Sequence, residues 1–201
     1  METPSDDLVS LDTGHPIWDR FFTVSPLVVV GTREGDGHDL APKHMATPLG
    51  WSNYFGFVCS PGHATYRNAR REGAFTVSFP RPEQVVVTSL TASPRCPGEE
   101  HKPQLRALPT FPAREVDGVF LEDAYLFLAC ELDRVVDGFG ENSLVAGRIV
   151  GAHVREEALR SSEVEDQEVL AATEPLVYLS PGRWARVEES AGFPFPTGFR
   201  R

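Results

Sequence analysis

Residues 26–80 read PLVVVGTREGDGHDLAPKHMATPLGWSNYFGFVCSPGHATYRNARREGAFTVSFP, in which apolar segments alternate with turns. The apolar segments at 27–32, 54–59 and 75–79 are rich in β-branched and aromatic residues. Such short apolar runs, bounded by turn-forming residues, are typical of buried strands. This part of the chain therefore predicts a β-rich core built from antiparallel strands.

Two other patterns lie between those strands. Asp36 is flanked by glycines on both sides, which is typical of a hairpin turn. The segment 63–72 is rich in helix formers and ends at Gly73, a residue suited to a helix C-cap. Two loops, 43–47 and 60–65, thus follow strand ends and carry small, hydroxyl-bearing and basic residues. Such a pair of loops can hold a phosphorylated ligand across a small barrel.

The second half of the chain predicts a long hairpin and a smaller one. Its expected elements are strands at 124–136 and 143–154 around Asp137-Gly138-Phe139-Gly140, a helix at 163–173, and strands at 176–180 and 183–187 around Pro181-Gly182. The β-branched segment 84–93 is compatible with either a short helix or a strand. Five prolines between positions 94 and 112 indicate a long surface excursion without regular structure.

Both ends of the chain differ in composition from the middle. Residues 1–23 are mostly polar and are expected as a lead-in with a short helix packed on the barrel, around Trp18 and Phe22. The tail at 189–201 ends in AGFPFPTGFRR, whose phenylalanines predict a contact surface rather than a free end. The barrel domain is therefore expected at 24–188.

Length and charge exclude several classes of protein. A chain of 201 residues suits one domain with a full core. Its 19 basic and 29 acidic residues give a net charge of −10, which disfavours a nucleic-acid partner. We expect no membrane span and no secretory signal. The three cysteines are widely spaced and odd in number, which indicates no disulfide framework and fits a cytoplasmic protein.

The two loops are the candidate binding segments. Lys43-His44-Met45-Ala46-Thr47 offers an ammonium group, an imidazole, a hydroxyl and backbone amides to phosphate oxygens and to the polar edge of a ring. On composition alone, an ordinary polar loop is the simpler explanation. Ser60-Pro61-Gly62-His63-Ala64-Thr65 opens a helix, where a glycine allows close approach and free N–H groups favour an anion. A plain capping turn, with Ser60 or Thr65 as the cap, is compatible with that interpretation.

Other chemistries find little support in the sequence. The six histidines show neither HxH nor HxxxH spacing, so a metal site is disfavoured. The chain contains no GxSxG elbow for nucleophilic hydrolysis and no GxGxxG dinucleotide fingerprint. Any nicotinamide would therefore bind without a Rossmann unit.

Taken in order, the segments resemble the flavin reductase-like, FMN-binding split-barrel family. The matching pieces are AP-x-x-x-x-T-P, S-P-x-H-x-T-x-x-N and F-T-V-S-F-P, followed by the closing strands, over roughly 24–187. The resemblance implies a mainly β fold, an antiparallel split barrel of about six strands with a few helices outside. It implies non-covalent FMN, held by Lys43, His44, Met45, Ala46, Thr47, Cys59, Ser60, Pro61, Gly62, His63 and Thr65. Asn68 also matches, and we expect it to be structural.

The resemblance further implies an activity and an assembly. The activity is hydride transfer from NADH or NADPH to flavin, with electrons passed on to free flavin, a quinone or another small-molecule acceptor. Two alternatives stay open, an FMN-binding electron carrier with little reductase activity and a structural barrel without ligand. Similar split barrels usually form homodimers with the flavin at the two-fold interface, so a homodimer is expected.

Two segments depart from the family pattern. Where similar reductases have G-D-H-x-L-x-x-G, with a histidine near the nicotinamide, residues 140–147 read GENSLVAG and Asn142 replaces the histidine. Asparagine carries no proton at neutral pH, so slow or unusual nicotinamide oxidation is expected, although a turn-forming role explains Asn142 at least as well. His63 and Ala64 stand where family members often have a basic and an acidic residue.

Overall fold

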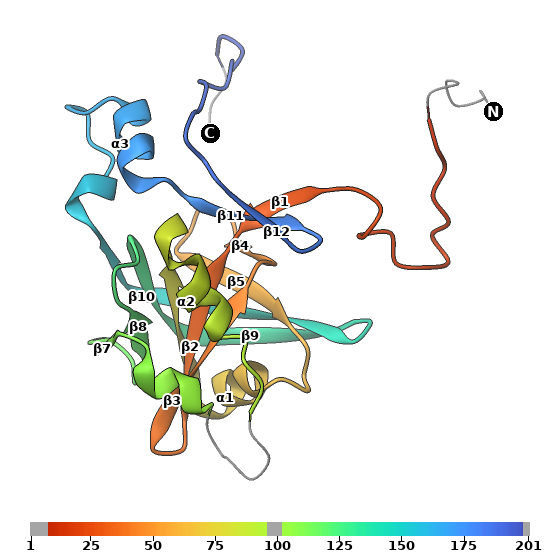
Figure 1. Cartoon of the computed structure of the whole chain (residues 1–201), viewed down its shortest axis with the longest axis vertical. Coiled ribbons are helices and arrows are strands. Elements are labelled where there is room, and N and C mark those ends of the chain that lie inside the picture. The colour runs from red at the N-terminus through yellow and green to blue at the C-terminus, as the bar shows by residue number, and fades with distance from the viewer. Residues whose placement is uncertain (1–7, 96–101, 199–201) are drawn as a thin grey trace.

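The computed structural model describes residues 8–95 and 102–198. A seven-stranded antiparallel sheet curls around the core, and Figure 1 shows its two long strands crossing the molecule. In order across the sheet its strands are β3 (Gly37–Lys43), β2 (Val28–Glu34), β6 (Ala74–Phe79), β9 (Leu126–Phe139), β10 (Asn142–Val154), β5 (Tyr54–Cys59) and β4 (Ala46–Pro48). The predicted mainly β, split-barrel class is confirmed, and the main sheet has one strand more than expected.

The concave side of the sheet holds an apolar core. Val28 and Val30 of β2, Phe57 of β5 and Phe75 of β6 are almost completely buried there. The rings of Phe57 and Phe75 meet edge to face, with centroids 5.2 Å apart. The bulky residues predicted as strands in the 26–80 segment therefore supply much of this core.

Helix α1 (Ala64–Glu72) packs against the sheet and ends where the sequence predicts. Gly73 has φ 69°, in the left-handed region that favours glycine, and its N–H donates to Ala69 O at 3.0 Å. Asn68 is buried, and its amide donates to Thr32 Oγ1 and Glu34 Oε1 of β2. These bonds attach α1 to the sheet and fit the structural role expected for Asn68.

Strands β9 and β10 form a long hairpin whose turn is at residues 140–141. Its strand β9 continues to Phe139, so the turn is shorter than the broad tip predicted at 137–140. Figure 1 shows this tip extending beyond the rest of the sheet. Asn142 is the first residue of β10 and pairs with Phe139 there.

The proline-rich excursion contains regular structure, so the prediction of none at 94–112 is wrong for the described part; residues 96–101 lie outside the described residues. A 3-10 helix, η2, covers Pro103–Ala107, and β7 (Thr110–Pro112) pairs with β8 (Val119–Leu121). Proline is tolerated at a helix start and on a short edge strand, where its missing N–H is not needed. Packing explains the strand, because Phe111 contacts the rings of Phe120 and Phe127.

The ambiguous segment at 84–93 forms a helix. The 3-10 turn η1 (Pro82–Gln84) leads into α2 (Val85–Leu90), so the helical alternative is the correct one. The predicted helix near 163–173 is α3 (Asp166–Thr173), preceded by the 3-10 turn η3 (Glu156–Ala158). Among the described residues, no helix is long and apolar enough to cross a membrane.

The ends of the chain contribute a second sheet and two extended segments. Strands β1 (Thr23–Pro26), β11 (Leu176–Ser180) and β12 (Arg183–Arg186) form it in the order β1-β11-β12, and β1 was not expected. The helix expected before it is absent from residues 8–22, and Trp18 and Phe22 are exposed. In the tail, Phe193 and Phe195 contact each other and are also exposed.

Candidate functional site

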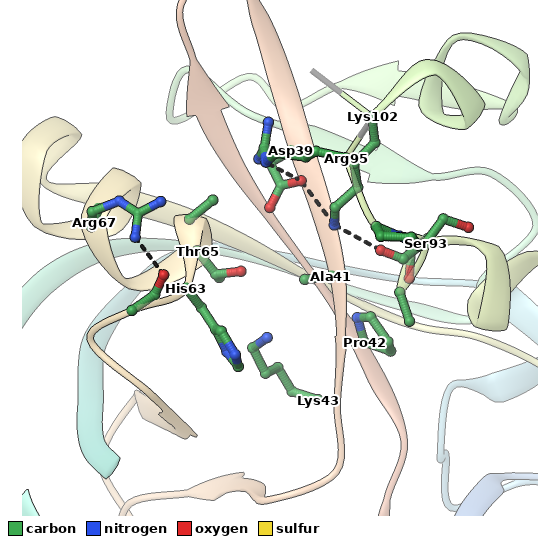
Figure 2. Close-up of a pocket in the computed structure, with 15 residues that line it drawn as sticks. Asp39, Ala41, Pro42, Lys43, His63, Thr65, Arg67, Ser93, Arg95 and Lys102 are labelled. Atoms are coloured by element: carbon green, nitrogen blue, oxygen red, sulfur yellow. Dashed lines mark hydrogen bonds and ion pairs between the residues drawn. The ribbon is translucent and has the colours of Figure 1, made fainter. Parts of the chain in front are cut away.

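A pocket of about 440 Å³ lies between β3, the first turn of α1 and the segment that follows α2. Figure 2 shows Lys43 and His63 directed into the same space from opposite walls, with Arg95 and Lys102 along its far side. The lining residues are Asp39, Ala41, Pro42, Lys43, Gly62, His63, Ala64, Thr65, Arg67, Thr91, Ala92, Ser93, Pro94, Arg95 and Lys102.

The lining is basic although the protein as a whole is acidic. It includes two lysines, two arginines and a histidine, and Asp39 is the one acidic residue among the described residues that line it. The whole chain, in contrast, has a net charge of −10. A local excess of cations in a concave site favours a small anionic ligand even when the net charge does not.

Lys43 is the last residue of β3 and lies on the pocket face of that strand. Side chains alternate along a strand, so Asp39, Ala41 and Lys43 share this face. The Lys43 ammonium makes no hydrogen bond or ion pair with any residue that the structure describes. Burial lowers the pKa of Lys43 below its usual 10.5, an effect that Cys59 and Asp39 partly oppose. This ammonium group is therefore partly desolvated and free to bind an anion.

The first turn of α1 forms the opposite wall. His63 precedes the helix in extended conformation, and its side chain does not cap the helix. The first N–H groups of α1 therefore donate no hydrogen bond to the His63 side chain and are left for other acceptors. Thr65 is buried, and its hydroxyl makes no hydrogen bond with the described residues. Arg67, one turn further, donates to the carbonyl of Gly62 and stays exposed. Amide, hydroxyl and imidazole groups thus converge at a helix N-terminus, which favours an anion.

The third wall is an ion-pair network around a buried carboxylate. Asp39 is 1% exposed, and Lys102 Nζ lies 3.0 Å from its Oδ1. The Lys102 ammonium also donates to Leu40 O and Thr91 O, each at 2.8 Å. Arg95 lies 3.5 Å from Asp39 and 2.8 Å from Glu34. This network ties Thr91, Arg95 and Lys102 to β3, and the sequence did not predict it.

Of the predicted site residues, the pocket brings together Lys43, Gly62, His63 and Thr65. Cys59 is buried behind them, with its Sγ 3.8 Å from His63 Nδ1, and burial raises the pKa of its thiol. The remaining two residues of that loop shape the turn or face outward: Ser60 accepts the Gly62 N–H, and Pro61 is exposed.

The rest of the first loop lies outside this pocket. His44 follows Lys43 and points the other way, where its ring stacks on Tyr178 at 4.3 Å. Burial lowers the pKa of His44, with a smaller contribution from the Lys43 charge. Met45 is 52% exposed, Ala46 is buried in the core and Thr47 is exposed. β3 ends at Lys43 and the chain bends at His44, so the two neighbouring side chains separate at this point.

The structure also bears on Asn142 and on metal binding. Asn142 is exposed at the hairpin tip and does not line the pocket. No group of three histidine, cysteine or carboxylate side chains in the described part of the chain is arranged to hold a metal ion.

Comparison with known proteins decides the family. The profile of the flavin reductase like domain matches residues 20–183. This chain belongs to the flavin reductase like family. Membership in it places the chain among flavin-related oxidoreductases and confirms the family that the sequence motifs resemble. No curated protein gives a significant match.

Solved structures share the fold across nearly the whole chain. Component B of nitrilotriacetate monooxygenase from Bacillus cereus superposes with a TM-score of 0.80 at 18% identity, over 94% of this chain and 100% of that one. Flavoredoxin from Methanosarcina acetivorans gives 0.76 at 17% identity, over 96% and 97%. An FMN-binding protein from Thermus thermophilus, solved with p-hydroxybenzaldehyde, gives 0.69 at 22% identity, over 96% and 100%. At these identities the likeness establishes the fold.

Proposed function

We propose that the pocket binds FMN non-covalently and that the protein is an oxidoreductase of the flavin reductase type. The observation that carries this proposal is the Lys43 ammonium, which has no partner among the described residues and faces the N-terminus of α1 across a basic pocket (Figure 2). A phosphate group satisfies this arrangement, because an ammonium, an imidazole, a hydroxyl and helix amides are all phosphate donors.

Each wall has a separate task in this proposal. Lys43, His63 and Thr65 hold the phosphate, while Ala41 and Pro42 border the path of the flavin ring along β3. Lys102 and Arg95 fix the far wall through Asp39. FMN, when bound, supplies the ability to accept a hydride and to release electrons singly or in pairs. The protein contributes orientation and access to solvent.

The electron donor we propose is NADH or NADPH, and the acceptor is free flavin, a quinone or another small molecule. Support comes from the family and from an FMN-binding protein among the structural neighbours. One observation favours the second candidate, an FMN-binding electron carrier with little nicotinamide-dependent activity. Asn142 stands where similar reductases have a histidine, and it cannot donate a proton in that role.

We further propose a homodimer that completes the flavin site. The family supports this assembly, and so do the exposed rings of Phe193 and Phe195, since apolar clusters of this kind mark contact surfaces. Light scattering at micromolar concentration checks it, and removal of residues 192–201 is expected to weaken either the dimer or flavin binding. A monomer of unchanged flavin affinity contradicts it.

Colour and reduction kinetics test the proposed function. The purified protein is expected to bind added FMN and to show the absorbance band of bound flavin, which for flavins in general lies at about 450 nm. Anaerobic stopped-flow mixing with NADH, and separately with NADPH, then measures bleaching of that band. Bleaching identifies a reductase, whereas stable colour with both donors identifies the carrier. A protein that binds no FMN contradicts both candidates.

A further inference from the structure

A second cavity, of about 480 Å³, lies beside the flavin pocket and is lined mainly by apolar side chains. One wall is α2, which presents Val86 and Leu90, and the other is the β11–β12 hairpin. In Figure 1, α2 lies next to that hairpin. Pro42 and Ala92 line both cavities, so the two share a wall.

The hairpin wall is aromatic. Tyr178 and Trp184 are directly paired across β11 and β12, which places both side chains on one face of the hairpin. The Tyr178 hydroxyl accepts the N–H of Gly182 at 2.8 Å, and its ring stacks on His44, so this side chain is held from both sides. Trp184 is 45% exposed, which leaves an indole surface open to the cavity mouth. Apolar and aromatic walls of this kind suit a small planar ring.

The cavity also carries a single charge. Arg183 is the one charged residue among the described residues that line it. Its guanidinium group is exposed and makes no ion pair or hydrogen bond with any residue that the structure describes. A guanidinium next to an apolar cavity matches a carboxylate on an apolar body, because its planar fork binds both carboxylate oxygens.

We propose that this second cavity binds a small aromatic carboxylate, with the ring between α2 and the β11–β12 hairpin and the carboxylate on Arg183. The proposal goes beyond FMN binding and does not depend on it, because no lining side chain assigned to the phosphate belongs to this cavity. A ring bound here lies against the wall of Pro42 and Ala92 that the two cavities share.

Calorimetric titration with two matched probes tests the proposal. 1-Naphthoate carries the carboxylate, and 1-naphthalenemethanol is a neutral molecule of nearly the same shape. Naphthoate is expected to bind the unaltered protein roughly tenfold more tightly than the alcohol, because one partly exposed charge-assisted hydrogen bond contributes about that much affinity. Arg183→Gln is expected to remove this difference. Arg114→Gln is the matched control, because Arg114 is also exposed and lines neither cavity.

A second variant tests the location independently of Arg183. Val86→Glu places a carboxylate on the exposed α2 side of the cavity, where the native side chain is 66% exposed, so folding is expected to persist. It should weaken naphthoate more than the alcohol, and thermal unfolding checks the fold of each variant. Four results overturn the proposal. They are equal affinity for both probes, equal loss in the two arginine variants, no binding at millimolar probe, and displacement of naphthoate by saturating FMN.

Discussion

Two walls of the proposed flavin pocket carry a lysine, but they use it differently. On the wall formed by residues 91–95 and Lys102, the Lys102 ammonium is enclosed by two backbone carbonyls and the Asp39 carboxylate. On the β3 wall, Lys43 has no such partner in the part of the chain that the structure describes. A lysine whose donors are all used stabilises the fold, whereas a lysine with free donors in a pocket is available to a ligand. The comparison teaches that charge in a pocket does not by itself identify the binding residues.

The largest expected effect is on stability, through Lys102. Lys102→Met leaves the buried Asp39 carboxylate with Arg95 as its ion-pair partner among the described residues, and removing one partner of a buried ion pair costs about 3 kcal/mol. Urea unfolding measures this loss. In the double variant Lys102→Met/Asp39→Asn the carboxylate charge is gone, so the combined loss should be smaller than the sum of the two single losses. Additive losses would show that the two residues do not act as a pair.

The next effect is on FMN affinity, through the walls formed by β3 and by the first turn of α1. Replacing Lys43 by Met and His63 by Ala together removes an ammonium donor and an imidazole donor and is expected to raise the FMN dissociation constant by about a hundredfold. Because His63 makes no side-chain cap to α1, the free energy of unfolding should change little. The dependence of binding on salt should also flatten. Loss of stability without loss of affinity would reverse the roles assigned to the two walls.

A smaller effect is expected from a single hydroxyl. Thr65→Ala removes a donor at the N-terminus of α1 and should weaken FMN binding by about 1–2 kcal/mol in a fluorescence titration. Thr47→Ala is the control, because Thr47 belongs to the candidate loop but is exposed and lies outside the pocket. Equal effects in the two variants would mean that the phosphate does not lie at α1.

The smallest effect on binding is expected at Asn142, where the change concerns rate. Asn142→His restores the histidine of similar reductases at the hairpin tip and should increase NADH-dependent flavin reduction while FMN affinity stays constant. Stopped-flow kinetics at saturating FMN measures both quantities. If the unaltered protein already reduces flavin rapidly and the substitution has no effect, Asn142 has no part in nicotinamide oxidation.

The sequence predicts the β3 and α1 walls better than the wall formed by residues 91–95 and Lys102. Lys43, Gly62, His63 and Thr65 follow strand ends or open a helix, so local patterns locate them. The hydrogen bond from Lys102 to Leu40 O joins residues 62 apart in the sequence, so no local sequence pattern predicts it. His44 was assigned to the site with its neighbour because residues 43–47 read as a loop. β3 in fact continues to Lys43, which lines the pocket, whereas the chain bends at His44 and the ring of His44 stacks on Tyr178.

The same limit applies to the proline-rich excursion. Its prolines correctly indicate an interrupted chain, yet Phe111 packs between two other aromatic rings, and that packing supports a short strand. Such tertiary contacts override local preference and cannot be read from a single segment.

The most direct test of the account compares FMN with riboflavin, which lacks the phosphate, in the unaltered protein and in Lys43→Met. Calorimetric titration of the four combinations gives the coupling between the phosphate and the ammonium group. We predict that FMN binds the unaltered protein more tightly than riboflavin does. The substitution should weaken FMN by about 1.5–3 kcal/mol and leave riboflavin nearly unchanged. Equal losses for both ligands, or no loss for either, would contradict the assignment of Lys43 to the phosphate.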